Sequence, residues 1–429
     1  MPEGPQAGRA LWPRIPWARW FPARDERNIR LYMFGQSVSI LGTWVLDILL
    51  NLVLWQATRS PGLLGLLNFL LYMPGLLITP LFSASLSAHN ARRRTMHVLA
   101  GGFTIALLLA LCAALGWLTA PLILALALAR GVLNGMEQPA RQMLLASSVS
   151  RLEQIGGAVA LNTVVFQVAR MVGPALAALL FSSIGAGWGF VFSGAAVAVM
   201  IGCVLRVRPG APLAPVAPHA AAKGRDGLRG ALDFVRADRF GSLFVPVTVC
   251  MALCTGGYQT LVPVLGDRVF GDTARWTSLF FAAAGAGALA AALLMSTHLA
   301  PGAQRRLLVP VPWAVALALL GLGTTRWAPL SLLCFGVIGF GMTTVTVGVG
   351  SVLHRRVPAQ ARNGLIALML VAFNGMIALA QVPAGLLAGR LGVQPALRVM
   401  GGCMLASMLL LFVRRWRRLG RFEADAERL

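Results

Sequence analysis

Apolar runs long enough to cross a lipid bilayer recur in this chain from Leu31 to Val413, and they limit its fold more than any other feature. About 20 consecutive apolar residues cross the hydrocarbon core as an α-helix. Lipid offers no hydrogen bonds to an open backbone, so such runs fold as helices. Charged residues make up 12% of the chain, against about 25% in soluble domains. The sequence therefore predicts an all-α membrane protein.

Twelve spans are predicted, in two six-helix halves separated by a polar, proline-containing connector. The connector ends in GLRGALDFVRADRF, whose apolar positions recur at helical spacing and predict a surface helix. The predicted organisation is a leader (1–30), a first half (31–205), the connector (206–240), a second half (241–413) and a tail (414–429). The predicted spans are 31–56, 62–86, 96–117, 121–143, 156–181, 187–205, 241–264, 276–298, 307–324, 328–352, 365–389 and 394–413.

The net charge of +23 comes from an uneven distribution of arginines. Of the 37 Lys and Arg, 29 fall on one side of the membrane when the spans alternate in direction. Cytoplasmic segments carry such an excess, so we expect both termini in the cytoplasm. Basic stripes with interleaved aromatics are absent, which argues against a nucleic-acid partner. Six arginines fall on the opposite, periplasmic side: Arg59, Arg268, Arg275, Arg326, Arg390 and Arg398.

Polar residues are rare in every third predicted span, and they form stripes along one face of the first, fourth and fifth spans. The third, sixth, ninth and twelfth spans are nearly free of polar groups, so they can face lipid. The stripes are Gln36, Thr43, Asp47 and Asn51 on the first span, Arg130, Asn134, Glu137 and Arg141 on the fourth, and Asn162, Phe166 and Arg170 on the fifth.

Charged residues deep in a bilayer cost about 2.5–3.5 kcal/mol each even on a lenient scale. Asp47 and Arg130 both lie roughly 14 Å from the periplasmic end of their spans, so they can pair. One interpretation is a structural ion pair or polar packing. The other is a titratable carboxylate in a water-filled cavity, where a proton is exchanged for substrate; that cavity would be formed by Asp47, Asn51, Arg130, Asn134 and Arg170. Two acidic groups (Asp47, Glu137) and two basic groups (Arg130, Arg170) balance, which does not dictate a cationic substrate.

Cofactors and metals are not expected. The six cysteines lie within apolar spans and the histidines at span ends or in loops, which argues against a metal site. The chain contains no GxxxxGKS loop for a nucleotide, and its single lysine, Lys223, lacks a glycine-rich context. The chain also lacks the clustered acid and base residues that an enzyme would need.

Several stretches resemble the major facilitator superfamily, within the drug:proton antiporter group that includes macrolide efflux proteins and the enterobactin exporter. They are RNIRLYMFGQSVSILGTW, SPGLLGLLNFLLYMPGLL, GMEQPARQ, LNTVVFQVARMVGPALAALL and VPAQARNGLIALMLVAFNG. The fourth is similar to the group's antiporter motif, which implies that Gly173 and Pro174 have a conformational role.

The loop after the second span departs from the superfamily pattern. Ala88 in this loop stands where an acidic residue is usual. The entrance of the eleventh span also departs from the pattern, because Arg362-Asn363-Gly364 stands where Arg-Gly-Arg is usual. Glu137 is a candidate replacement, as a gating partner of Arg92 or Arg362. The alternative is a local pair between Glu137 and Arg141, one helical turn apart.

The resemblance implies a secondary active exporter in a bacterial inner membrane, driven by proton antiport and acting as a monomer on a small molecule. Siderophore export is the first expectation, and multidrug or macrolide efflux is the alternative. A non-transporting membrane sensor and a membrane enzyme are rivals from other classes.

Overall fold

The structure is a computed structural model that describes residues 27–87, 89–147, 152–207, 224–238, 240–296, 306–357 and 362–426. These residues contain 12 helical spans long and apolar enough to cross a membrane, which confirms the predicted fold class. The first half consists of α2 (Arg27–Thr58), α3 (Pro61–Ala84), α4 (Ala91–Ala114), α5 (Ala120–Ser147), α6 (Leu152–Ser183) and α7 (Ala186–Arg206). The second half consists of α9 (Gly241–Gly256), α10 (Tyr258–Arg268), α11 (Thr273–Ser296), α13 (Pro310–Thr324), α14 (Ala328–Arg356), α15 (Arg362–Leu370), η2 (Val371–Gly375), α16 (Met376–Leu391) and α17 (Val393–Ala426).

A short helix between the halves, α8 (Gly224–Ala237), confirms the surface helix predicted at the end of the connector. Ala231 and Val235 lie one turn apart and are buried. Arg229, Asp233 and Arg236 are exposed. This separation of apolar and charged faces is what holds an amphipathic helix against a bundle.

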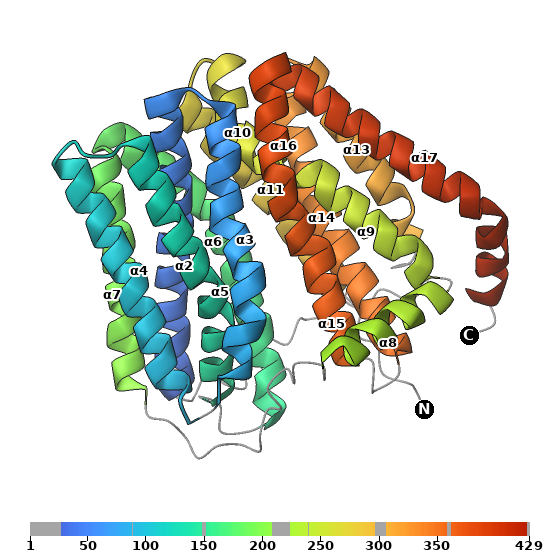
Figure 1. The fold of residues 1–429 in the computed structure, drawn as a ribbon, viewed down its shortest axis with the longest axis horizontal. Coiled ribbons are helices and arrows are strands. Elements are labelled where there is room, and N and C mark those ends of the chain that lie inside the picture. Colours follow the sequence, from blue (N-terminus) through green and yellow to red (C-terminus); the bar gives the residue numbers. More distant parts are fainter. Residues whose placement is uncertain are drawn as a thin grey trace, which may run out of the picture.

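The two halves repeat the same packing. Helix α3 packs on α5 as α11 packs on α14, and α4 packs on α7 as α13 packs on α17. Between the halves, α6 packs on α11 as α3 packs on α16. In Figure 1, α4 and α7 lie at one outer edge and α13 and α17 at the other. These are the spans that the sequence leaves nearly free of polar groups.

Glycines allow the closest helix crossings. A Cβ atom added to Gly131 of α5 would overlap the carbonyl oxygen of Leu70 in α3. Gly287 and Gly339 make equally close approaches between α11 and α14. Small residues at such crossings let membrane helices pack backbone to backbone.

The halves come together at one end of the molecule. We call this end, which carries the α2–α3, α10–α11 and α16–α17 connections, the Arg59 end, and the opposite end the α8 end. Figure 1 shows the helices of the two halves close together at the Arg59 end, at the top, and farther apart toward α8. There, Gly65 of α3 packs on the Gln381 carbonyl of α16, and Gly385 of α16 packs on the Pro61 carbonyl.

Two spans of the second half are interrupted, which the sequence analysis did not predict. The seventh span divides into α9 and α10 at Gly257, whose backbone lies against Ala384 of α16. The eleventh contains the π-helical turn η2. Interruptions of this kind occur often at functional sites, and the one at Gly257 directly precedes Tyr258.

Candidate functional site

An ion cluster lies between α2 and α5, at the centre of the first half. Arg130 Nη1 donates to Glu137 Oε2 at 2.9 Å, and Arg130 Nε lies 3.9 Å from Asp47 Oδ1. The three side chains are at most 16% exposed. The expected pairing of Asp47 with Arg130 is therefore present. Among the described residues, Asp47 Oδ1 has no hydrogen-bond partner.

Arg141 belongs to the same cluster and is buried, although it falls near the end of its predicted span. It pairs with Glu137 and donates to Gln36 Oε1 and, at 2.7 Å, to Ser39 Oγ. The local pair of Glu137 with Arg141 is therefore present, whereas pairing with Arg362 stays a prediction because the Arg362 side chain lies outside the described residues. Among the described residues, the central charges are the arginines Arg130, Arg141 and Arg170 and the carboxylates Asp47 and Glu137, so the balance of two to two inferred from the sequence omitted Arg141.

A cavity about the size of one water molecule lies beside this cluster. It can hold water next to the charges but is too small for an organic substrate. Its lining residues are Gly42, Thr43, Leu46, Val98, Leu99, Gly102, Arg130, Glu137, Ser193 and Val197.

A chain of buried polar side chains connects Asp47 to the second half. Asn51 Nδ2 donates to the Asp47 carbonyl at 2.9 Å, and Asn68 Nδ2 donates to Asn51 Oδ1 at 2.8 Å. Asn68 also donates to Thr260 Oγ1 at 3.3 Å, and Thr260 donates to Gln381 Oε1 at 2.7 Å. We call Asn51, Asn68, Thr260 and Gln381 the interhalf polar chain. It joins α2 and α3 to α10 and α16.

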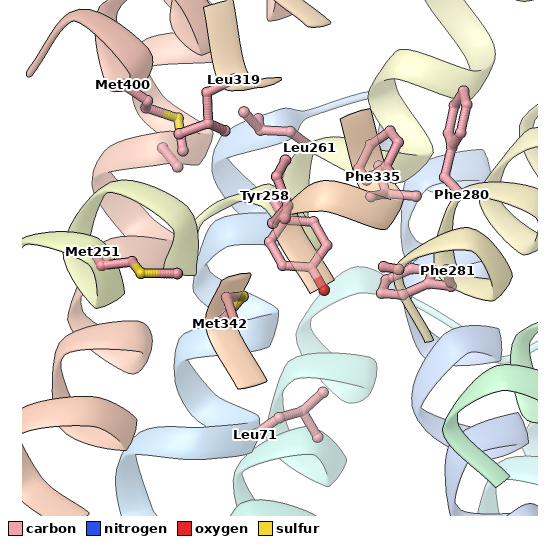
Figure 2. Packing of buried hydrophobic residues seen from close by; sticks show 14 of the residues in the cluster. Leu71, Met251, Tyr258, Leu261, Phe280, Phe281, Leu319, Phe335, Met342 and Met400 are labelled. Carbon is pink, nitrogen blue, oxygen red and sulfur yellow. The ribbon is translucent and has the colours of Figure 1, made fainter. Parts of the chain in front are cut away.

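Arg170 of α6 faces the second half. Its Nη2 donates to the Tyr258 hydroxyl at 3.3 Å, and its guanidinium lies 5.9 Å from the ring centroid of Trp44. Figure 2 shows the Tyr258 hydroxyl directed away from Leu261 and Phe335. Tyr72 of α3 lies within electrostatic range of Asp47, Arg130, Arg170 and Tyr258. The two halves therefore contribute to one central group of polar side chains.

Of the other predicted site residues, Asn134, Gly173 and Pro174 lie around this centre, and Arg92 does not. Asn134 Nδ2 donates to the Leu71 carbonyl at 3.4 Å. Gly173 packs against Trp44, and Pro174 is buried within α6. Arg92 lies apart from Glu137 and donates to the Leu205 carbonyl at 2.7 Å. The side chain of Arg362 and the whole of Ala88 lie outside the residues whose placement the structure describes.

The described residues contain no group of three or more His, Cys, Asp or Glu side chains that could hold a metal ion. The chemistry of the site therefore rests on two carboxylates, three guanidinium groups and the tyrosine, asparagine, threonine and glutamine side chains around them. Such a set can bind, exchange and hold protons and anions in a low-dielectric environment.

Residues 18–428 match the model of a family of major facilitator proteins described as transmembrane secretion effectors. The chain belongs to this family. Membership of the major facilitator superfamily, which the resemblance implied, is thereby confirmed. The members of the superfamily found as structural neighbours are transporters, which are not enzymes.

One curated relative of this major facilitator protein is the staphyloferrin A transporter of Staphylococcus aureus (strain NCTC 8325 / PS 47). The two are 25% identical over 242 residues, which cover 56% of this chain and 59% of that protein. The match thus spans about three-fifths of the curated relative's length.

Solved transporters share the fold over nearly the whole chain. The nucleoside transporter NupG superimposes with a TM-score of 0.71 at 11% identity, covering 90% of this chain and 98% of that one. The human organic anion transporter MFSD10 gives 0.59 at 17% identity, covering 90% and 99%. The POT family transporter PepTSo gives 0.66 at 11% identity, covering 92% and 99%. At these identities, the likeness concerns the fold alone.

Sequence reasoning missed several residues of this transporter's centre, above all Tyr72, Tyr258 and the second-half members of the interhalf polar chain. One available signal was rarity, because the chain has only three tyrosines. Two lie at the centre, and the third, Tyr32, donates to the Arg141 carbonyl. A second signal was the presence of Asn68 and Gln381 within otherwise apolar spans.

Proposed function

We propose that this transporter is a secondary active exporter that exchanges protons for a small organic molecule, and that the molecule is a siderophore. The description of its family as secretion effectors supports export. The relative named as a staphyloferrin A transporter supports a siderophore as the substrate.

The observation that carries the proton coupling is the unequal sharing of Arg130 between two carboxylates. Glu137 accepts a hydrogen bond from Arg130 and also pairs with Arg141. Asp47 lies 3.9 Å from Arg130 and accepts no hydrogen bond at Oδ1 from the described residues. Asp47 can therefore take up a proton without breaking a hydrogen bond, whereas Glu137 cannot.

The interhalf polar chain connects protonation of Asp47 to the packing of the two halves against each other. Asn51 is bonded to the Asp47 carbonyl and, through Asn68, to Thr260 in the second half. A small shift of α2 on protonation of Asp47 would strain this chain, which holds the Arg59 end together. Buried polar networks have discrete arrangements, so such a shift can favour one packing of the halves over another.

The arginine distribution supports a cytoplasmic location for the α8 end. In that orientation the structure is closed toward the outside of the cell. Both termini would then lie in the cytoplasm, as in the predicted topology, and the membrane would be a bacterial inner membrane. A proton entering from outside contributes about 1.4 kcal/mol per pH unit and about 2.3 kcal/mol per 100 mV. Exchange would use these contributions to move substrate outward against its gradient.

The test is uptake of labelled staphyloferrin A into inverted membrane vesicles under an imposed proton gradient. We expect Asp47→Asn to insert and fold normally, to abolish uphill uptake and to keep substrate binding. Asp233→Asn, on the exposed face of α8, is the matched control and should transport as the unmodified chain does. Full uphill uptake by Asp47→Asn would move the coupling site to Glu137.

Substrate identity is tested in the same vesicles with a macrolide as competitor. Uptake of the macrolide and not of the siderophore would replace the substrate part of the proposal with drug efflux. Binding without transport of either compound, in the unmodified chain, would instead indicate a sensor.

A further inference from the structure

Arg170 is a partly buried arginine of α6 at the centre of the molecule. Its guanidinium contacts the neutral Tyr258 hydroxyl and the Trp44 ring. Among the described residues, no carboxylate lies within ion-pair distance of it. A cation at mid-bilayer depth is costly and, in membrane proteins, commonly marks a pathway for ions or substrates.

The rest of the cluster cannot supply a counter-ion. Glu137 is held between Arg130 and Arg141, and Asp47 lies beside Arg130. Three guanidinium groups thus face two carboxylates, and the third guanidinium, Arg170, is the one nearest the second half. The Arg170 charge is therefore not neutralised by Asp47 or Glu137, and a bound anion from outside the chain would neutralise it.

Flat apolar surfaces surround this charge. Phe166 lies one turn before Arg170 on α6, is 38% exposed, and meets the Trp44 ring edge-on at a centroid distance of 5.9 Å. Trp44 is partly exposed. Tyr258 contacts Arg170 from the other half and packs on Phe281 and Phe335. The exposed Phe166 ring and the partly exposed Trp44 ring beside a guanidinium suit an organic anion with a planar or apolar body.

We propose that Arg170, beside Tyr258, binds the carboxylate of an organic acid substrate whose body lies against Trp44 and Phe166. This inference rests on the proposed transport function but uses a different group from the proton site at Asp47. Guanidinium and carboxylate form two parallel hydrogen bonds, which makes arginine selective for this anion. Phe166 and Trp44 would contact the body of the substrate, whatever its charge.

The experiment measures equilibrium binding of 2-naphthoate and of its neutral amide, 2-naphthamide, to the purified full chain. The two probes share the ring system and differ in charge, so their affinity ratio reports on the cation alone. We expect the acid to bind about ten- to a hundredfold more tightly than the amide. Arg170→Gln should remove this preference, and Arg170→Lys should keep part of it. The control Arg275→Gln, at an exposed arginine of the Arg59 end, should leave the ratio unchanged.

Phe166→Ala provides a second variant at a partly exposed position, in case Arg170→Gln does not fold. It should weaken both probes to a similar degree and keep their ratio. Equal binding of acid and amide by the unmodified chain, no binding of the acid, or an unchanged ratio in a folded Arg170→Gln protein would each overturn the proposal. Asp47→Asn should keep the ratio. Failure of uphill transport and failure of carboxylate recognition are therefore observed separately.

Discussion

Arg59 and Asp267 form an ion pair of 2.6 Å that links the two halves at the Arg59 end. Arg59 lies in the α2–α3 connection of the first half, and Asp267 lies at the end of α10 in the second. Trp55 packs beside the pair, with the guanidinium groups of Arg59 and Arg268 at 5.8 and 5.6 Å from its ring. This contact lies beyond the interhalf polar chain and closes the same end of the molecule.

Asp267→Asn should partly open the Arg59 end. The Arg59 and Asp267 side chains are 58% and 25% exposed, so solvent screens the pair. Exposed pairs contribute about 0.2–1 kcal/mol, which corresponds to a population shift of roughly fivefold or less. Spin labels at the exposed Gln56 and Arg390, in a cysteine-free background, would report the separation of the halves. Charge exchange in Arg59→Asp with Asp267→Arg should restore the original distances. If Asp267→Asn leaves the distances unchanged, the pair does not hold this end closed.

Glu137→Gln should destabilise the protein far more than Arg92→Gln does. The first change leaves two buried guanidinium groups, Arg130 and Arg141, without their shared carboxylate, which costs about 3–5 kcal/mol. The second removes a hydrogen bond to the Leu205 carbonyl at an exposed site, worth about 1 kcal/mol or less. Thermal unfolding of the purified variants measures both. Equal losses would mean that Arg92 has a buried carboxylate partner in the protein as purified.

The ion cluster could be predicted in part because depth can be counted along a helix. Asp47 and Arg130 lie in apolar spans at equal distances from one end, and that count brought them together correctly. The burial of Arg141 could not be predicted, because α5 continues to Ser147 beyond the predicted end at residue 143. A shift of one turn at a span end moves an arginine from the interface to the interior.

Contacts between the halves could not be predicted. Asn68 satisfies one donor within its own helix, by bonding to the Leu64 carbonyl, so its sequence context gives no indication of Thr260 as a partner. The interruption at Gly257 had a visible sign, the Gly256-Gly257 pair within an apolar span. A glycine pair permits an interruption without requiring one, and the close packing on Ala384 of α16 is a tertiary contact.

Gly131→Ala should destabilise the first half, whereas Gly102→Ala should not. A methyl group at Gly131 would overlap the Leu70 carbonyl, and the α3–α5 crossing would have to separate, at a cost of about 1–3 kcal/mol. At Gly102 of α4 an added Cβ atom meets nothing within 4 Å. Alanine is also favoured over glycine in helix interiors by roughly 0.5–1 kcal/mol. The midpoints of thermal unfolding should therefore shift in opposite directions. A similar fall in both would mean that helix packing does not limit stability at Gly131.

Thr119→Cys and Ser87→Cys should label from opposite sides of the membrane. Thr119 is exposed in the α4–α5 connection at the Arg59 end, and Ser87 is exposed at the α8 end. Only six arginines fall on the Arg59 side in the predicted topology, against 29 Lys and Arg on the other. Since basic residues stay in the cytoplasm, a membrane-impermeant maleimide should label Thr119→Cys in intact spheroplasts. Ser87→Cys should label only after permeabilisation, and the unmodified chain corrects for its native cysteines. The reverse pattern would invert the orientation, so that the structure would be closed toward the cytoplasm and open toward the outside.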